Sequence, residues 1–158
     1  MNDKTKQNKY RLWTNSKSVS YNYGGTFGIS YLLPKNYLIG GNLTVNKLDR
    51  QTENDGLEDA FDTPEWIYNV SFGNTNVYQN IGFNLNFRQQ AQFLWQSSLA
   101  NGTVAGYSTL DAQVNYSFLK SKAIIKVGAN NALNKYAYTF TGGPSVGGFY
   151  YTALTFEL

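Results

Sequence analysis

Residues 143–147 read Gly-Pro-Ser-Val-Gly, which matches the spacing of a nucleophile elbow for acyl transfer. That chemistry needs a strand before the serine, a helix after it and a histidine that takes the hydroxyl proton. The chain contains no histidine, and an alternating strand pattern follows Gly147 instead of a helical one. We therefore expect Ser145 to lie at the tip of a glycine-rich loop, and we do not expect an enzyme.

Carboxylates raise a second chemical possibility, a calcium site. Six of them cluster in one segment: Asp49, Glu53, Asp55, Glu58, Asp59 and Asp62. A flexible, carboxylate-rich loop can attract calcium, but this spacing does not fit an EF-hand. The alternative is a solvated loop that contacts a ligand, with Asp55, Glu58 and Asp59 as candidate contacts. Cysteine and histidine, the usual ligands of transition metals, are absent, so no cofactor is expected.

The elements that must position these residues are strands. Apolar and polar residues alternate with a period of two, and helical periodicity is nearly absent. The pattern predicts strands over residues 20–33, 37–45, 66–74, 81–95, 109–118, 123–130 and 150–158, with residues 10–15 as the end of one more. One face of each strand is apolar, whereas the other carries mainly asparagine, glutamine, threonine, serine and glycine.

Three features favour a transmembrane barrel over a soluble sheet. Strands of ~9–11 residues match a tilted membrane crossing. The connections alternate between short (34–36, 75–80, 119–122) and long (49–64, 96–106, 132–148), as periplasmic turns and extracellular loops do. Aromatic residues gather at strand ends like two interfacial girdles. They are Tyr31, Tyr37, Phe118 and Phe156 near the short turns, and Trp66, Trp95, Tyr107 and Tyr150 near the long loops.

The expected fold is therefore an all-β, antiparallel transmembrane β-barrel segment, with an apolar face toward lipid and a polar face toward a lumen. A soluble carbohydrate-binding sandwich is the alternative, but it does not explain the alternating connection lengths. Arg88 and Asp111 fall on the lumen face of neighbouring strands. Because buried charges usually find partners, they are expected to pair within the wall or, alternatively, to contact a plug or a ligand.

Charge and the N-terminus bear on partners and processing. The net charge of +3 is spread along the chain and does not suggest nucleic acid. The first residues lack the apolar core of a secretory signal peptide. Because an outer-membrane barrel must be exported, we expect this chain to be a piece of a longer precursor.

Several segments resemble TonB-dependent outer-membrane receptors of the Bacteroidetes type. They are Asn-Asp-Gly-Leu-Glu-Asp at 54–59, Thr-Pro-Glu-Trp at 63–66, Tyr-Ser-Thr-Leu-Asp-Ala at 107–112, Asn-Ala-Leu-Asn-Lys-Tyr at 131–136 and the glycine-rich stretch 142–148. Their order and spacing extend the resemblance over residues 19–158. The chain departs from the family pattern at Ala132, where a larger apolar residue is usual, and at Leu158, where phenylalanine is usual.

The resemblance implies that residues 1–158 supply about seven C-terminal strands of a plugged barrel of about 22 strands. The plug, the TonB-binding segment and the N-terminal strands would lie elsewhere in the receptor. The implied location is the outer membrane of a Gram-negative bacterium. The implied partners are membrane lipid, the rest of the receptor, the TonB complex through the missing plug, and the barrel-assembly machinery.

The resemblance also implies function. The last strand carries an alternating set similar to a barrel-assembly signal: Tyr150, Leu154, Phe156 and Leu158. The implied activity is import of a siderophore, a glycan, a peptide or a similar ligand. The alternative is a small self-contained barrel, either a passive pore or an adhesin, in which residues 10–15 provide an eighth strand.

Overall fold

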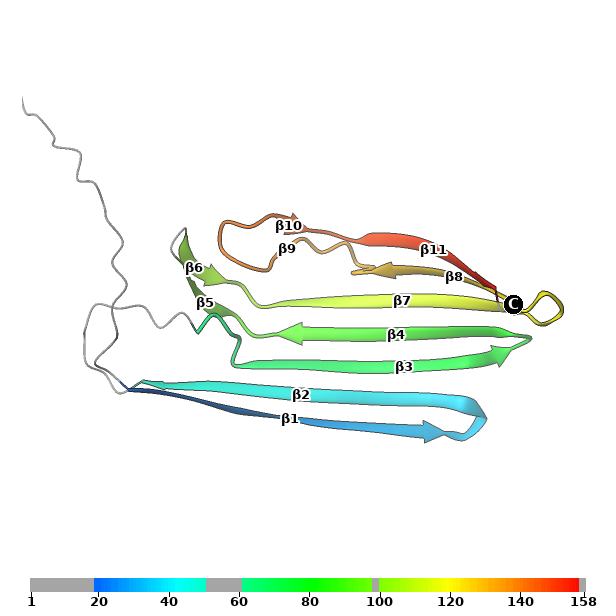
Figure 1. Ribbon diagram of the computed structural model, residues 1–158, viewed down its shortest axis with the longest axis horizontal. Helices are drawn as coiled ribbons and strands as arrows, with labels where there is room; N and C mark the ends of the chain where they lie inside the picture. The colour runs from blue at the N-terminus through cyan, green and yellow to red at the C-terminus, as the bar shows by residue number, and fades with distance from the viewer. Residues whose placement is uncertain (1–18, 51–60, 98–99, 157–158) are drawn as a thin grey trace, which may run out of the picture.

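The computed structural model describes residues 19–50, 61–97 and 100–156. Seven strands form one antiparallel sheet in the order β1-β2-β3-β4-β7-β8-β11 (Figure 1). Each of these strands pairs with the main-sheet strand that precedes or follows it in the chain. Their bounds are β1 Ser20–Leu33, β2 Tyr37–Arg50, β3 Trp66–Tyr78, β4 Ile81–Gln90, β7 Tyr107–Phe118, β8 Ala123–Asn130 and β11 Phe149–Phe156. The all-β expectation is thus confirmed.

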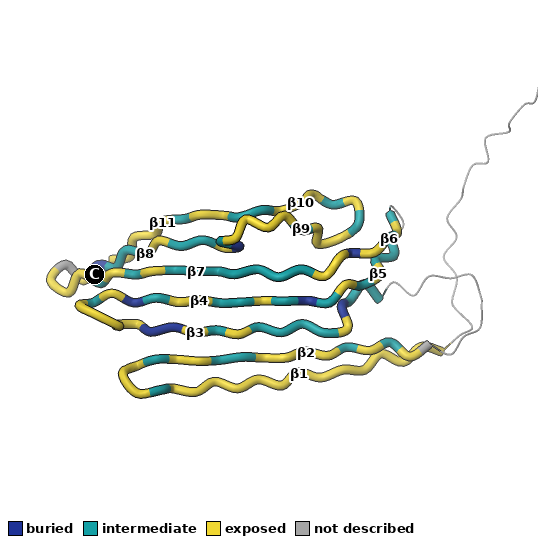
Figure 2. The backbone as a smooth tube through the Cα atoms, turned by 180° about the vertical axis from the view of Figure 1, so that it is seen from behind, coloured by how far each residue is buried: buried dark blue, intermediate teal, exposed yellow. Residues whose placement is uncertain are grey.

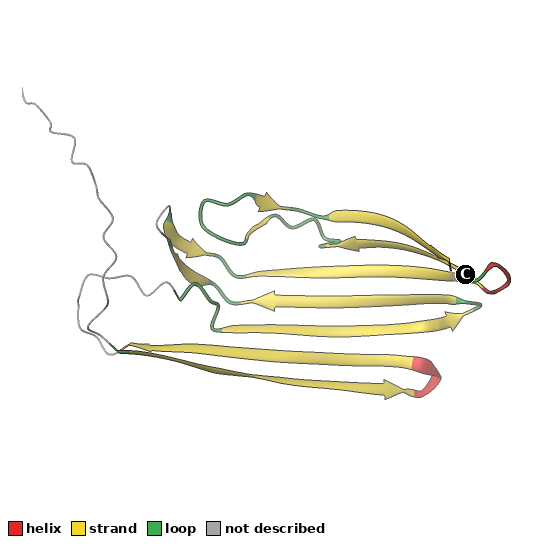
Figure 3. Ribbon diagram, in the orientation of Figure 1, coloured by secondary structure: helices red, strands yellow, loops and turns green. Residues whose placement is uncertain are grey.

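The two ends of the sheet differ. At one end, the short-turn end, the single-turn helix η1 (Pro34–Asn36), a turn at Gln79 and Asn80, and η2 (Leu119–Ser121) join the strands (Figure 3). At the other, the long-loop end, the connections hold two small hairpins (Figure 1). These are β5 (Phe93–Gln96) with β6 (Asn101–Val104), and β9 (Ala137–Tyr138) with β10 (Ser145–Val146). The short connections therefore lie at one end of the sheet, and the long connections lie at the other.

The strand register sorts side chains onto two faces. Leu43 lies opposite Tyr68, Phe72 opposite Leu85, and Val114 opposite Val127, which defines the apolar face. Asn42 opposite Asn69, and Ser71 opposite Asn86, lie on the other, polar face. Because side chains alternate along a strand, the register carries this division across all seven strands.

The apolar face is not covered by the chain. Val104 and Ala123 are the buried hydrophobic residues of the described part. By contrast Phe27 is 71% exposed and Leu154 56%, and all seven main strands carry exposed large hydrophobic residues. Figure 2 shows β1 exposed along almost its whole length. So large an exposed apolar surface requires lipid or another chain against it.

In the part of the chain that is described, no helix is long and apolar enough to cross a membrane.

One strand expectation is wrong at its end. The apolar alternation from Ile81 continues through Phe93 and Trp95, but pairing within the main sheet ends at Gln90. Phe93–Gln96 leaves the sheet and pairs with Asn101–Val104 as a separate hairpin. The expected loop 96–106 therefore contains the end of β5 and all of β6. The hairpin β9–β10 likewise lies within the expected loop 132–148.

The aromatic girdles are confirmed in part. Ring contacts on the apolar face join Tyr37 to Phe72 at 5.7 Å near the short turns, and Trp66 to Tyr68 at 5.7 Å near the long loops. Tyr107, however, lies opposite Gln90 on the polar face. Trp95 lies in β5, outside the main sheet.

The sheet ends in two edges. β1 pairs with β2 on one side, β11 pairs with β8 on the other, and no described strand lies beyond either. The expected strand at residues 10–15 lies outside the described residues, as does Leu158.

Candidate functional site

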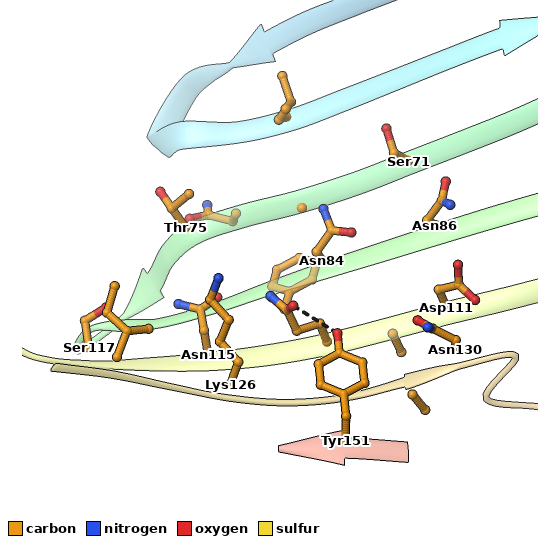
Figure 4. A pocket seen from close by; sticks show the side chains of 18 of the residues that line it. Ser71, Thr75, Asn84, Asn86, Asp111, Asn115, Ser117, Lys126, Asn130 and Tyr151 are labelled. Carbon is orange, nitrogen blue, oxygen red and sulfur yellow. Dashed lines mark hydrogen bonds between the residues drawn. The ribbon is translucent and has the colours of Figure 1, made fainter. Parts of the chain in front are cut away.

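The polar face is hollowed over its central strands. A depression of 660 Å³ is lined mainly by lumen-facing side chains of β3, β4, β7, β8 and β11 (Figure 4). Ser71, Asn84, Asn86, Asp111 and Asn130 are among them, and each comes from a strand whose opposite face is apolar. A hollow on this side fits a wall that curves around a lumen.

Neutral amides dominate this hollow. Asn84, Asn86, Asn115 and Asn130 form no side-chain hydrogen bond within the described ranges. Each offers donors and acceptors together. The charged residues of the lining are Asp111 and Lys126. The surface can therefore bind water, hydroxyls or peptide groups without strong charge selection.

The side chain of Tyr151 lies over Gly128 on the polar face of the sheet. The Tyr151 hydroxyl lies 3.1 Å from Oε1 of Gln113, two strands away, so its ring must pass over β8 (Figure 4). Gly128 is the residue beneath the ring, and a Cβ there would lie 2.5 Å from Tyr151 Cζ. The missing side chain at Gly128 thus leaves the space that lets Tyr151 tie β11 to β7.

Asp111 anchors a loop. Its Oδ1 accepts the backbone N–H of Asn131 at 2.8 Å, at the point where the chain leaves β8. The neighbouring amide of Ala132 donates to the carbonyl of Leu110 at 2.7 Å. These contacts join the motif at 107–112 to the motif at 131–136, which the sequence presents as separate.

Asn131 then shapes the following turn. It is 8% exposed, and its side chain donates to the Lys135 carbonyl at 2.8 Å and accepts the Lys135 amide at 3.2 Å. Asn134 accepts the Gly148 amide at 2.8 Å, which closes the base of the loop. Both asparagines have left-handed backbones (φ 51° and 50°), a conformation that asparagine tolerates better than most residues.

The long-loop end is one connected assembly. The Asp62 carboxylate accepts the Gln96 amide at 2.6 Å, which links the β2–β3 connection to the β5–β6 hairpin. The rings of Trp95 and Phe140 lie 5.6 Å apart and link that hairpin to the β8–β11 loop. A cleft of 410 Å³ opens between β6 and β9, lined by tyrosine rings and Lys135.

The structure places some of the predicted site residues and leaves others outside the described ranges. Arg88 and Asp111 lie on the lumen face as expected. The expected pairing of the two is absent from the described part, where Asp111 instead accepts the Asn131 amide. The loop candidates Asp55, Glu58 and Asp59 lie outside the described residues.

The assembly-signal residues are placed as far as the description reaches. Tyr150, Leu154 and Phe156 share the apolar face of β11 by register. Asn131, Asn134, Gly128 and Tyr151 were not predicted as site residues. Asn131 and Asn134 lie in the segment 131–136 that resembles TonB-dependent receptors, so the sequence did contain a signal that could have pointed to them. The tie over Gly128 depends on pairing across three strands, which local sequence does not reveal.

Comparison with known proteins gives one family. A family model described as "Outer membrane protein beta-barrel family" matches residues 1–154. No curated protein gives a significant match to the chain.

Proposed function

Because this chain belongs to the outer membrane protein β-barrel family and lies in an outer membrane, we propose that it forms the C-terminal wall of a TonB-dependent receptor. The observation that carries the proposal is that, among the described residues, no strand pairs with the outer edge of β1 or of β11. Unpaired backbone groups are not tolerated in hydrocarbon, so a membrane sheet must close on itself. In the proposal, the remaining strands of the receptor close it.

The polar wall supports import of a ligand. A barrel of about 22 strands holds a plug in its lumen, and the neutral amides of the hollow suit contact with peptide groups or a hydrated solute. Arg88 and Asp111 are the proposed charged contacts of the wall. The proposed ligand is a siderophore, a glycan, a peptide or a similar molecule, and the TonB complex supplies energy through the plug.

The proposal also orients the chain. The long-loop end is extracellular and the short-turn end periplasmic, as in other outer-membrane barrels. Asp55, Glu58 and Asp59 are then ligand contacts on an outer loop. The barrel-assembly machinery recognises Tyr150, Leu154, Phe156 and Leu158 on the last strand.

The test is the size of the native protein. Antibodies against this chain should detect in outer membranes a heat-modifiable species far larger than 17.8 kDa, the mass of the chain. That species should co-purify with TonB after crosslinking. A protease-resistant, heat-modifiable species of the chain's own mass would contradict the receptor proposal.

A second candidate is a small self-contained barrel, a passive pore or an adhesin. The family match is compatible with it, and such a barrel would use residues 10–15 as an eighth strand. A species of the chain's own mass that closes without other strands would support it. Conductance in planar bilayers would then separate a pore from an adhesin.

A further inference from the structure

The Asp111 carboxylate is part of both the lumen hollow and the start of the β8–β11 loop. It lines the lumen hollow beside Asn130 (Figure 4), and it accepts the backbone amide that begins the β8–β11 loop. Among the described residues that line the hollow, Asp111 is the acidic one. None of the other lining residues forms an ion pair with its carboxylate. Lys126, the cation of the lining, lies opposite Asn115.

From Asp111 the contacts continue to the cleft at the long-loop end. Asn131 binds both backbone groups of Lys135, and Lys135 lines the 410 Å³ cleft together with Tyr136 and Tyr138. We name Asp111, Asn131 and Lys135 the clasp. Each link is a hydrogen bond of 2.8 to 3.2 Å, so the geometry at Lys135 depends on the position of the Asp111 carboxylate.

We propose that Asp111 is a positioning residue that couples the lumen to the cleft, and that a cationic group arriving in the lumen loosens the clasp. A half-buried carboxylate without a counter-ion attracts an ammonium or a guanidinium. The bond from the Asn131 amide to Asp111 is itself charge-assisted, because its acceptor is a carboxylate, and such bonds are roughly twice as strong as neutral ones. A cation bound to Asp111 neutralises part of the carboxylate charge, so the bond to the Asn131 amide weakens and the backbone at Lys135 is released.

The coupling requires only the barrel wall and not TonB-driven import, so it can hold where the receptor proposal fails. Trypsin reports on it directly, because Lys135 is exposed outside the strands and cleavage after it should become faster when the backbone there is released. Cleavage after Lys47, on β2, serves as the reference in the same sample. The protein is assayed whole, in isolated outer membranes, with heat-modifiability as the check that the barrel is assembled.

The first arm uses substitutions. Asp111→Ala removes one hydrogen bond of the clasp and should raise cleavage after Lys135 roughly five-fold, and Asn131→Ala, which removes two, should raise it at least as much. Asp111→Asn keeps an acceptor oxygen and should stay near wild type. The matched control is Asn86→Ala, which changes the lumen-facing residue directly opposite Asp111. Equal cleavage in assembled Asp111→Ala and wild type, or an equal rise in Asn86→Ala, would overturn the positioning role.

The second arm delivers the cation. The chain has no cysteine, so Asn130→Cys provides one thiol beside Asp111. An aminoethyl methanethiosulfonate adds an ammonium there, whereas the methyl reagent adds a neutral group of smaller size. The ammonium should raise cleavage after Lys135, the methyl group should not, and Asp111→Asn should abolish the difference. Equal effects of both reagents would show that charge in the lumen is not coupled to the cleft.

Discussion

Gly128 is a residue whose replacement should disturb the wall. Alanine there would place a methyl group 2.5 Å from Tyr151 Cζ, so the ring must move and its bond to Gln113 is lost. Overpacking of this kind costs ~1–3 kcal/mol. The free energy of unfolding of the refolded receptor, followed by tryptophan fluorescence in urea, should fall by that amount in Gly128→Ala.

A second glycine provides the control. A Cβ at Gly25, on the apolar face of β1, meets no atom within 4 Å. Gly25→Ala should therefore leave stability unchanged or raise it slightly, because glycine loses more backbone entropy than alanine on folding. If Gly25→Ala destabilises the protein as much as Gly128→Ala, the tie over Gly128 is not the cause.

The two faces can be tested at neighbouring residues. Leu85 lies on the apolar face of β4, and Asn84 lies on the polar face of the same strand. Arginine at Leu85 should cost ~2–4 kcal/mol at mid-membrane, whereas arginine at Asn84 enters a hydrated lumen. Refolding of each variant into lipid vesicles, measured by heat-modifiability, should separate them. Similar losses in both variants would reverse or remove the facing assignment.

At the scale of elements, the sidedness of the connections can be measured with single cysteines. Ser145 lies in β10 at the long-loop end, and Asn36 lies in η1 at the short-turn end, and both are exposed. On intact cells an impermeant maleimide should label Ser145→Cys and leave Asn36→Cys unlabelled. Lysed cells should show both labelled. Labelling of Asn36→Cys alone on intact cells would mean that the orientation is inverted.

The seven main strands are predictable because each has one face against lipid and one against a polar lumen. The sequence must then alternate at every residue, and the register in the structure follows that alternation. The end of β4 is not predictable in this way. Alternation continues to Trp95 although the chain leaves the sheet after Gln90, because Phe93 and Trp95 pack within the long-loop assembly.

The candidate site, like the strands, could be predicted from the sequence only in part. That Asp111 faces the lumen follows from strand parity. Its bond to Asn131 does not, because it joins residues 20 positions apart through the pairing of β7 with β8. The charge pairing expected for Arg88 and Asp111 ignored the backbone amides at strand ends, which also need acceptors. A carboxylate placed beside the start of a loop meets such an amide first.

At the scale of the whole molecule, the sheet has no interior of its own. Its buried hydrophobic residues in the described part are Val104 and Ala123, and only Ala123 lies in the main sheet. In a soluble domain the apolar face would supply most of the folding free energy by burial. Here that contribution must come from lipid on the outside, and in the proposed receptor strands beyond β1 and β11 complete the backbone pairing.

The last prediction follows from these open edges. β1 exposes a 14-residue edge and β11 an 8-residue edge, and neither is blunted by proline within the strand. Unprotected edges of this kind drive association with other chains. The 158-residue chain expressed alone should therefore aggregate, whereas the proposed receptor, in which other strands cover these edges, should assemble.

The role of β11 in insertion can be tested by substitutions within the proposed receptor. Serine at both Leu154 and Phe156 removes apolar side chains that are 56% and 62% exposed on the lipid face. The altered strand loses both its lipid contact and the residues proposed for recognition by the assembly machinery, so the heat-modifiable species should disappear from outer membranes. Serine at Ala153 together with alanine at Thr155 changes the lumen face of the same strand and should leave assembly intact. A normal level of assembled receptor with serine at Leu154 and Phe156 would show that the lipid face of β11 does not direct insertion.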